Sequence, residues 1–431
     1  MSNPESNQFK VGGPRATFVL IICSLLYAVN YMDRLVMSVV LQPMKIDLGL
    51  TDAQVGAVNT IFFFGVALFS LPVARFIDVW SRKKMIGLLA IIWSFFTLAT
   101  GFASGFKSLL AMRLGVGIGE AGFSSGGTAL ISASYPAEKR GAKLGIFNTF
   151  ITIGVIFGLI LGGYLSANYG GWRTPFYVFG IPGIILGILA FFMQDYSLKK
   201  ADGSAYVHES LLTNLKQLLK IPTLRWLYAG FAMYVLVQYG VMTWFPALLM
   251  RAFEIKEDKA GLIMAAVTVI GILGPILGGI LADKWGKKIG GGRMRMAGLS
   301  IAIAVVLLML TLLFTLDLTN KNLLIFSGIM MPLYSIFIGM ATPAISATSQ
   351  DVVNDKMRGL SWGTGVLFAF MIGGVLGPII VGGVSDAVGG GYKGLAQGFF
   401  VVGLFGILGS WFWFLSSRHV ESDKKKAQDA A

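Results

Sequence analysis

Four charged side chains lie inside long apolar stretches of the sequence. Asp33 and Arg34 occur in the first such stretch, and Arg113 and Glu120 occur in the fourth. A charge at the depth of a bilayer costs roughly 2.5–3.5 kcal/mol on insertion scales, so each of these residues marks a functional site by default. Arg113 and Glu120 are seven residues apart, so a helix would place both on one face, about 10 Å from each other.

An aspartate opposite an arginine in a partly dry cavity has two states. When Asp33 is ionised it can pair with Arg113, and when it is protonated the arginine is free to bind an anionic substrate group. Proton binding would then change substrate affinity. We therefore predict proton coupling at Asp33, Arg113 and Glu120. The alternatives are a fixed packing network of all four charged residues, or an Arg34 that only neutralises Asp33.

Polar and aromatic side chains in the apolar stretches are the candidates for substrate contact. Those of the first stretch recur at i, i+3, i+4 and i+7, which places them on one helical face. The predicted substrate-binding set is Tyr27, Asn30, Tyr31, Arg34, Arg113, Gln238, Tyr239 and Tyr334. Lipid-facing or packing roles are the alternative for the uncharged members.

The composition predicts the elements that position these residues. Of 431 residues, 55% are hydrophobic and only 13% are charged, and the mean hydropathy is +0.74. These values exclude a water-soluble globular protein. Twelve helices of about 20 apolar residues require roughly 240 residues in the bilayer, which this length allows. The apolar stretches are of helix length, which argues against a barrel of strands of about 10 residues.

Twelve stretches have the length and hydropathy of membrane spans. They lie near 16–42, 52–73, 84–104, 108–135, 143–168, 173–193, 225–250, 260–282, 295–316, 322–350, 358–386 and 394–417. The predicted fold class is an all-α polytopic membrane protein of two six-helix bundles. Its parts are a tail (1–15), the first bundle (16–193), a linker (194–224), the second bundle (225–417) and a second tail (418–431). Five leucines of the linker share one face of a short amphipathic helix that begins near Ser210, which we expect to lie on the membrane surface.

The net charge of +14 reflects orientation in the membrane. With the N-terminus placed in the cytoplasm, 25 of the 35 Lys and Arg residues fall on the cytoplasmic side, eight on the other side and two inside spans. This threefold bias is the positive-inside pattern. It predicts that both termini are cytoplasmic and gives no support to nucleic-acid binding.

Several other kinds of chemistry are not expected. The single cysteine, Cys23, excludes an intrachain disulfide, and with only His208 and His419 beside it no zinc site is plausible. A G-x-G-x-x-G pattern at 117–122 lies within a span with no strand before it, so it does not indicate a dinucleotide fold. No nucleophile, base and orienting group occur together near the spans. We predict neither a cofactor nor an enzyme.

The two halves of the sequence repeat one another. A-R-F-I-D-V-W-S-R-K at 74–83 resembles G-I-L-A-D-K-W-G-K-K at 279–288, an offset of 205 residues. The segments beginning at Pro136 and Asn354, each ending in Arg-Gly, match at an offset of 218, and glycine pairs at 162–163 and 382–383 match at 220. Three ordered matches with similar offsets indicate a duplicated six-helix unit.

This arrangement resembles the major facilitator superfamily, which carries the repeated motif after helices 2 and 8. The resemblance implies a cytoplasmic gate in which the motif aspartates pair with basic residues after helices 4 and 10. The expected pairs are Asp78 with Arg140 and Asp283 with Arg358. The predicted gate residues are Asp78, Arg82, Arg140, Asp283 and Arg358. The first motif copy departs from the family pattern at 74, 79 and 81, which predicts a weaker latch in the N-terminal half.

The strings N-Y-M-D-R at 30–34, M-R-L-G-V-G-I-G-E-A-G at 112–122 and Y-P-A-E-K-R-G at 135–141 resemble the Spinster family and its bacterial relatives. This family includes carriers of lysophospholipids and sphingosine phosphates, and the resemblance implies proton-linked roles for Asp33, Arg113 and Glu120. Organic anion:proton symporters of the same superfamily share similar strings in helices 1 and 4.

The predicted function is proton-coupled transport of an amphipathic or organic anion by alternating access. A lysolipid-like substrate is the first expectation and a sugar acid the second. A lipid scramblase or transporter-like sensor without coupling is the rival from another class. The expected partners are the small-molecule or lysolipid substrate, protons and membrane lipids. We expect a monomer in the inner membrane of a bacterium.

Overall fold

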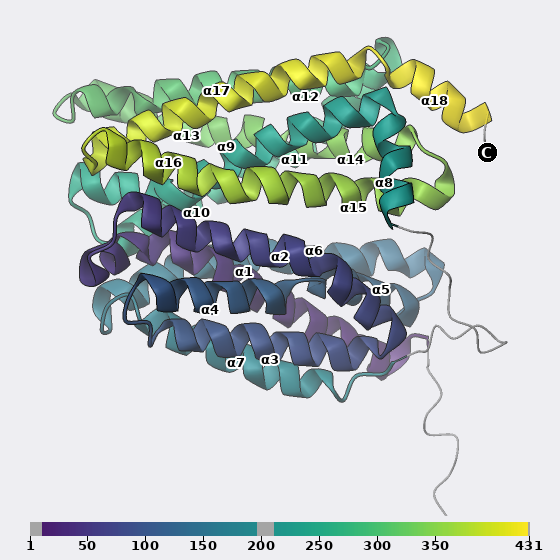
Figure 1. The fold of residues 1–431 in the computed structure, drawn as a ribbon, viewed down its shortest axis with the longest axis horizontal. Coiled ribbons are helices and arrows are strands. Elements are labelled where there is room, and N and C mark those ends of the chain that lie inside the picture. The colour runs from purple at the N-terminus through teal and green to yellow at the C-terminus, as the bar shows by residue number, and fades with distance from the viewer. Residues whose placement is uncertain (1–10, 196–210, 430–431) are drawn as a thin grey trace, which may run out of the picture. The chain divides into compact units, whose positions relative to one another are not determined.

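The computed structural model describes residues 11–195 and 211–429 (Figure 1). Helices make up all the regular secondary structure in this described part. Contacts divide the chain into two compact units, 1–48 with 64–207 and 49–63 with 208–431. Helix α2 (Asp52–Val79) contributes to both, because its first twelve residues pack with the second unit.

The first unit contains the N-terminal helices and the later part of α2. Its other helices are α1 (Gly13–Leu48), α3 (Arg82–Thr100), α4 (Phe106–Glu120), α5 (Phe123–Ser134), α6 (Ala137–Asn168) and α7 (Thr174–Ala190). Two pairs, α1 with α6 and α3 with α7, pack along much of their lengths. The span expected at 108–135 is interrupted, since α4 ends at Glu120 and α5 begins after Gly122, whose φ of 80° only glycine adopts readily.

The second unit contains the remaining helices. They are α8 (Leu211–Lys220), α9 (Pro222–Phe253), α10 (Glu257–Gly271), α11 (Leu273–Lys288), α12 (Gly292–Thr311), η2 (Leu312–Leu316), α13 (Lys321–Gly339), α14 (Ala341–Asp351), η3 (Asp355–Met357), α15 (Arg358–Phe368), η4 (Ala369–Gly374), α16 (Val375–Ala387), α17 (Gly391–Ser417) and α18 (Val420–Asp429). Helix α9 lies at the centre, packed against α17, α16 and η4. The η4 segment is a π-helix, a local widening that often accompanies functional positions.

Both polar segments that flank the second bundle form helices where they are described. The predicted amphipathic helix of the linker is confirmed as α8, whereas the start near Ser210 lies outside the described residues. The C-terminal tail forms α18. Its Asp423 accepts hydrogen bonds from the backbone N–H and the hydroxyl of Thr223 at 3.0 and 2.8 Å, which satisfies a backbone donor at the start of α9.

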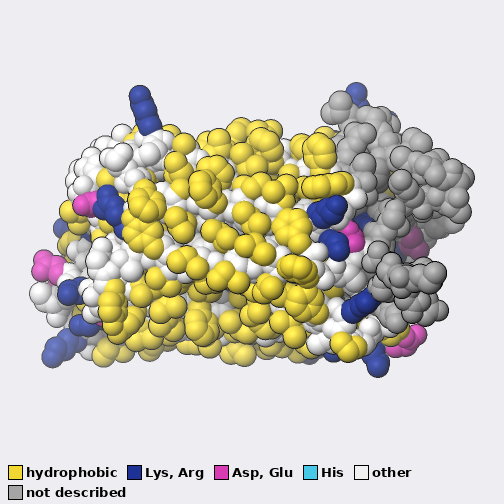
Figure 2. All heavy atoms as spheres, turned by 90° about the horizontal axis from the view of Figure 1, so that it is seen from below, with side chains coloured by type: hydrophobic (Ala, Val, Ile, Leu, Met, Phe, Trp, Pro, Cys, Tyr) yellow, Lys and Arg dark blue, Asp and Glu magenta, His cyan; other side chains and the backbone are white. Residues whose placement is uncertain are grey.

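Ten described helical segments are long and apolar enough to cross a membrane. The other two predicted spans correspond to the interrupted α4–α5 pair and to α7, which has 17 residues. Large apolar side chains remain exposed on the helices; on α7, Ile181, Ile185 and Ile188 are each about half exposed. The face drawn in Figure 2 is apolar over its middle, with charged side chains toward its two ends. These surfaces suit lipid, and the chain is a polytopic membrane protein.

Close helix packing in the first unit depends on glycine at defined positions. A Cβ on Gly154 of α6 would lie 2.2 Å from the carbonyl oxygen of Ala28 in α1, and one on Gly119 of α4 would lie 2.5 Å from the backbone nitrogen of Trp93 in α3. Backbones can approach this closely only where no side chain intervenes. These glycines bring α6 close to α1 and α4 close to α3, the helices that carry the charged residues and their neighbours.

Candidate functional site

The four predicted intramembrane charges meet in the interior of the first unit. Helix α1 carries Asp33 and Arg34, and α4 carries Arg113 and Glu120. Asp33 and Arg113 are completely buried, and Glu120 is 3% exposed. Burial of this many charges is tolerated only where they interact with one another. We call these four residues the charge cluster.

Two polar contacts organise the charge cluster. The Arg34 Nε donates to Glu120 Oε2 at 2.5 Å, an ion pair whose carboxylate is shielded from solvent. Asp33 Oδ2 accepts a hydrogen bond from the Thr97 hydroxyl of α3 at 3.1 Å, and the other Asp33 oxygen has no hydrogen-bond partner among the described residues. The alternative that Arg34 serves only to neutralise Asp33 is therefore wrong, because its ion pair is with Glu120.

Arg113 connects the two acidic residues electrostatically. Its guanidinium interacts with the charges of Glu120, Asp33 and Arg34. With both carboxylates ionised, the charge cluster is neutral. A proton on either carboxylate leaves one positive charge in a buried environment, where it can be compensated by an anion.

The position of Glu120 at the C-terminal end of α4 makes its negative charge unfavourable unless a cation lies nearby. A carboxylate in the last turn of a helix faces the negative end of the helix dipole, and α4 ends at Glu120 itself. Arg34 offsets this unfavourable position. Asn30 of α1 also lies beside Glu120, although it makes no hydrogen bond of normal geometry.

Aromatic rings extend the charge cluster along α1, as the helical spacing predicted. Arg34 lies over the ring of Tyr31 at 4.9 Å, and Tyr31 meets Tyr27 edge-on at 5.5 Å. Tyr27 stacks on Phe147 of α6 at 4.4 Å. The stripe of Tyr27, Tyr31 and Arg34 is continuous, and Tyr27 is anchored by packing rather than free to move.

A cavity of about 220 Å³ lies within the second unit. Two of the predicted substrate-binding residues line it, Gln238 of α9 and Tyr334 of α13. Tyr234 lies one helical turn before Gln238, and its hydroxyl is 3.2 Å from the Thr342 hydroxyl of α14. The full lining is Tyr234, Gln238, Val241, Met242, Met264, Val267, Thr268, Gly271, Pro275, Met331, Tyr334, Ser335, Ile338, Gly339 and Thr342.

The third predicted contact of this half, Tyr239, lies elsewhere in the second unit. Its ring packs against Phe63 at 4.5 Å and Phe370 at 5.5 Å and does not line the cavity. Both residues were predicted to contact substrate, but adjacent residues of a helix point about 100° apart, which explains why only Gln238 lines the cavity. The missed member was Tyr234, whose i, i+4 relation to Gln238 was visible in the sequence.

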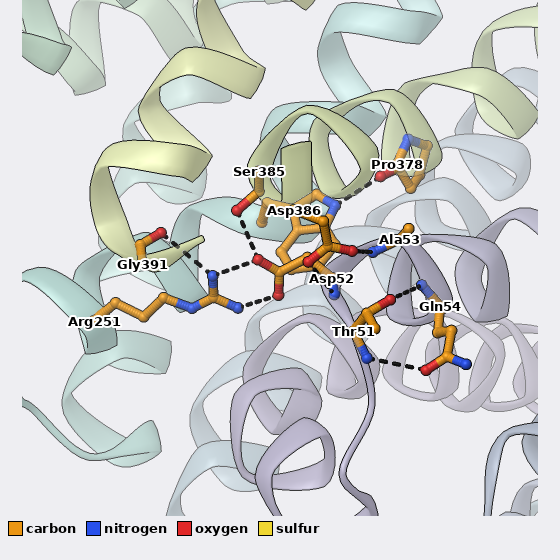
Figure 3. Close-up of polar contacts among 10 residues, drawn as sticks. Thr51, Asp52, Ala53, Gln54, Arg251, Pro378, Ser385, Asp386 and Gly391 are labelled. Carbon is orange, nitrogen blue, oxygen red and sulfur yellow. Dashed lines mark hydrogen bonds and ion pairs between the residues drawn. The ribbon is translucent and has the colours of Figure 1, made fainter. Parts of the chain in front are cut away.

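The second unit also contains an ionic network that the sequence did not predict (Figure 3). Asp52, the first residue of α2, accepts two hydrogen bonds from Arg251 at 2.7 and 2.5 Å and one from Ser385 at 2.6 Å. Asp386 accepts hydrogen bonds from the backbone N–H groups of Asp52 and Ala53 at 3.0 and 2.7 Å. A carboxylate at these first-turn donors stabilises the helix end. We call this set the Asp52 network.

The predicted gate residues have other partners than expected. Asp283 pairs with Arg293 at 2.9 Å, and Arg358 pairs with Asp355 at 2.9 Å, so the expected Asp283–Arg358 pair is not formed. Arg293 also bridges to Asp351 at 2.5 Å. The motif residue Asp283 thus pairs with Arg293, ten residues further along the chain. The repeated motif did not indicate this local partner.

In the first unit, the expected pair of Asp78 with Arg140 is neither confirmed nor contradicted. Arg140 donates to the backbone carbonyl of Tyr135 at 3.0 Å, and Arg82 is buried at the start of α3. The side chain of Asp78 lies outside the described residues. The gate roles of these residues remain predictions.

Relatives of two kinds match most of the chain. A probable galactarate/D-glucarate transporter of Bacillus subtilis is 28% identical over 401 residues, covering 86% of each chain. Protein spinster homolog 1 of Xenopus laevis is 24% identical and covers 96% of this chain and 83% of its own. The resemblance predicted from the sequence motifs is confirmed.

The fold matches that of a solved transporter. A bacterial homolog of the human lysosomal transporter Spinster, in an inward-facing and unoccupied conformation, superposes with a TM-score of 0.83 at 24% identity and covers 96% of this chain and 99% of its own. The family model of the Major Facilitator Superfamily matches residues 23–368. This chain is therefore a membrane transporter that belongs to the Major Facilitator Superfamily.

Proposed function

We propose that the protein is a proton-coupled transporter of an organic anion. The observation that carries the proposal is the charge cluster, in which two carboxylates and two guanidinium groups are buried together in the first unit. A purely structural role would be served as well by apolar side chains, because buried ion pairs give little net stability. Burying these four charged side chains costs free energy, and binding of protons and anions by the charge cluster would explain why they are present.

We assign proton binding to Asp33. Its Oδ2 has a neutral hydroxyl donor and its Oδ1 has no hydrogen-bond partner among the described residues, whereas Glu120 has a direct ion pair with Arg34. A proton on Asp33 leaves the cluster with one uncompensated positive charge. Arg113 then attracts a substrate anion, so proton and anion favour each other's binding.

The Asp52 network is proposed to fix the start of helix α2 to the second unit. Residues 49–63 precede and begin helix α2, yet they pack with the second unit. The charge distribution predicts that this end faces away from the cytoplasm. Asp52 bonds there to Arg251 and Ser385.

Relatives of both substrate classes support organic-anion transport in general. The galactarate and glucarate relative points to sugar acids, and the resemblance of the sequence motifs to the Spinster family implies amphipathic anions. A bacterial inner membrane is the proposed location, since the galactarate relative is bacterial. Both termini are proposed to be cytoplasmic.

Proton movement into liposomes tests the proposal directly. The full-length protein is reconstituted with a pH-sensitive dye inside, and galactarate, a lysophosphatidylglycerol or 3-phenylpropanoate is added outside. For symport, an accepted anion should acidify the interior, and for antiport it should make the interior more alkaline. Anion entry without any pH change would favour an uncoupled scramblase, and no entry at all would favour a sensor.

A further inference from the structure

Helix α3 contacts the charge cluster through the side chain of Thr97. We propose that Thr97 is a positioning residue, whose hydroxyl holds the Asp33 carboxylate and sets the pH range in which Asp33 binds its proton. This inference rests on the proposed proton binding by Asp33 and specifies how the pH dependence of that site is fixed.

Burial isolates the contact between Thr97 and Asp33 from water. Both residues are completely buried, and the Thr97 hydroxyl donates to Asp33 Oδ2 at 3.1 Å. Oδ1 of the same carboxylate has no hydrogen-bond partner among the described residues. A hydrogen bond is electrostatically stronger in such an interior than in water. One neutral donor therefore has a large influence on this carboxylate.

The charged groups around Asp33 act on it together with Thr97. Among the described residues they are Glu120 and Arg113 on α4 and Arg34 on α1 itself, and they act on Asp33 electrostatically. Glu120 repels an ionised Asp33, whereas the two guanidinium groups attract it. Because these effects oppose one another, a single hydrogen bond has a measurable effect on the protonation of Asp33.

The Thr97 hydroxyl can serve both protonation states of Asp33, because a hydroxyl is a donor and an acceptor. It donates to the ionised carboxylate. When Oδ2 carries a proton, the acid O–H donates to the Thr97 oxygen, and the Thr97 hydroxyl turns to the backbone carbonyl of Trp93, four residues earlier, as threonines in helices do. A hydrogen bond to the charged form is about twice as strong as one between neutral groups. Thr97 therefore favours the ionised form of Asp33.

The packing of α3 holds Thr97 in place. A Cβ on Gly119 of α4 would lie 2.5 Å from the backbone nitrogen of Trp93, and one on Gly180 of α7 would lie 2.7 Å from the Cβ of Leu98. These close approaches to two neighbouring helices leave α3 little room to slide or rotate. The backbone therefore positions the hydroxyl before Asp33 changes its charge.

Thr100 lies almost one turn further along α3 and provides a comparison. It is completely buried as well, but its hydroxyl donates to the Phe96 carbonyl of the same helix at 2.8 Å. Of these two buried threonines, only Thr97 donates to a carboxylate. Thr100→Val is therefore the matched control for removing a buried hydroxyl from α3.

Infrared titration of the purified full-length protein tests the proposal without any substrate. The carboxylic acid C=O band of Asp33 is identified by its loss in Asp33→Asn, and its intensity is followed against pH. Thr97→Val nearly keeps the shape of the side chain and removes the hydroxyl. It should move the midpoint about one unit toward higher pH, a tenfold increase in proton affinity. Thr97→Ser, which keeps a hydroxyl, and Thr100→Val should titrate like the wild-type protein.

An unchanged or lower midpoint in Thr97→Val would overturn the inference and leave proton binding by Asp33 intact. An equal shift in Thr100→Val would also overturn it, because the loss of either buried hydroxyl of α3 would then have the same effect. If Thr97→Val does not fold, Thr97→Ala removes the same hydroxyl and must show the same shift. If Asp33→Asn loses no titrating band, the proposed proton binding is overturned together with this inference.

Discussion

The two units of this transporter concentrate different chemistry in their interiors. The first unit buries Asp33, Arg34, Arg113 and Glu120 together, whereas the cavity of the second unit is lined only by uncharged residues. The sequence repeats indicate that both units derive from one six-helix ancestor. The predicted duplication would therefore combine a repeated helical framework with different interior residues.

This difference agrees with the proposed proton coupling. Proton binding would require titratable groups whose charges depend on one another, and the first unit contains such groups. The cavity of the second unit offers neutral hydrogen-bonding groups in place of charges. The second unit keeps its carboxylate–arginine pairs near helix ends instead, as in the Asp52 network. Four substitutions test this difference, from the largest expected effect to the smallest.

The largest loss of stability is expected for Glu120→Gln. The substitution leaves Arg34 without its buried counter-charge, and breaking such a pair costs about 3–5 kcal/mol. Thermal unfolding of the purified protein measures the effect. The double variant Arg34→Gln with Glu120→Gln should recover part of the loss, and additive losses would show that the pair is not coupled.

A smaller effect is expected for Asp52→Asn in the second unit. The buried carboxylate loses its charge-assisted hydrogen bonds with Arg251, which are worth about 1.5–3 kcal/mol. Asp47→Asn is the matched control, because Asp47 bonds Arg173 with a side chain that is 47% exposed, and its loss should be clearly smaller since solvent screens the pair. Equal losses of unfolding free energy in the two variants would contradict the special role of the Asp52 network.

Two tyrosines of the second unit should respond differently to removal of the hydroxyl. Tyr228 donates to the Ser361 carbonyl at 2.7 Å, so Tyr228→Phe should cost about 1 kcal/mol of unfolding free energy. Tyr334 has no hydrogen-bond partner among the described residues, so Tyr334→Phe should leave the stability of the ligand-free protein unchanged or slightly raised. A large loss in Tyr334→Phe would indicate that its hydroxyl serves the fold.

A small effect is expected for Arg358→Gln. Its ion pair with Asp355 is largely exposed, and pairs of this kind contribute about 0–1 kcal/mol. Arg293→Gln should cost more, because Arg293 bridges both Asp283 and Asp351. A loss in Arg358→Gln equal to or larger than that in Arg293→Gln would favour the gate pairing expected from the family motif.

Much of this architecture was predictable because membrane helices leave strong periodic and compositional signals. Ten spans and the amphipathic helix α8 follow from hydropathy, and the meeting of Asp33, Arg34, Arg113 and Glu120 follows from the cost of isolated charges in a bilayer. The break after Glu120 was missed because glycines are common in membrane helices and do not by themselves indicate an interruption.

Pairings between side chains were less predictable than their locations. The sequence placed Arg34 beside Asp33, yet the ion pair forms with Glu120, because neighbouring residues on a helix point in different directions. Arg251 was counted only among the basic residues outside the spans and Asp52 was not singled out, because their contact depends on how α2 packs with helices far away in the sequence. Thr97 is one of several hydroxyl residues in its span and gave only a weak signal.

The most direct test of proton coupling compares the wild-type protein with Asp33→Asn in liposomes loaded with a pH-sensitive dye. The account predicts that an accepted anion changes the internal pH with the wild-type protein. Asp33→Asn should still exchange that anion across the membrane but should produce no pH change and no accumulation driven by a pH gradient. Gradient-driven accumulation by Asp33→Asn at the wild-type level would contradict the account.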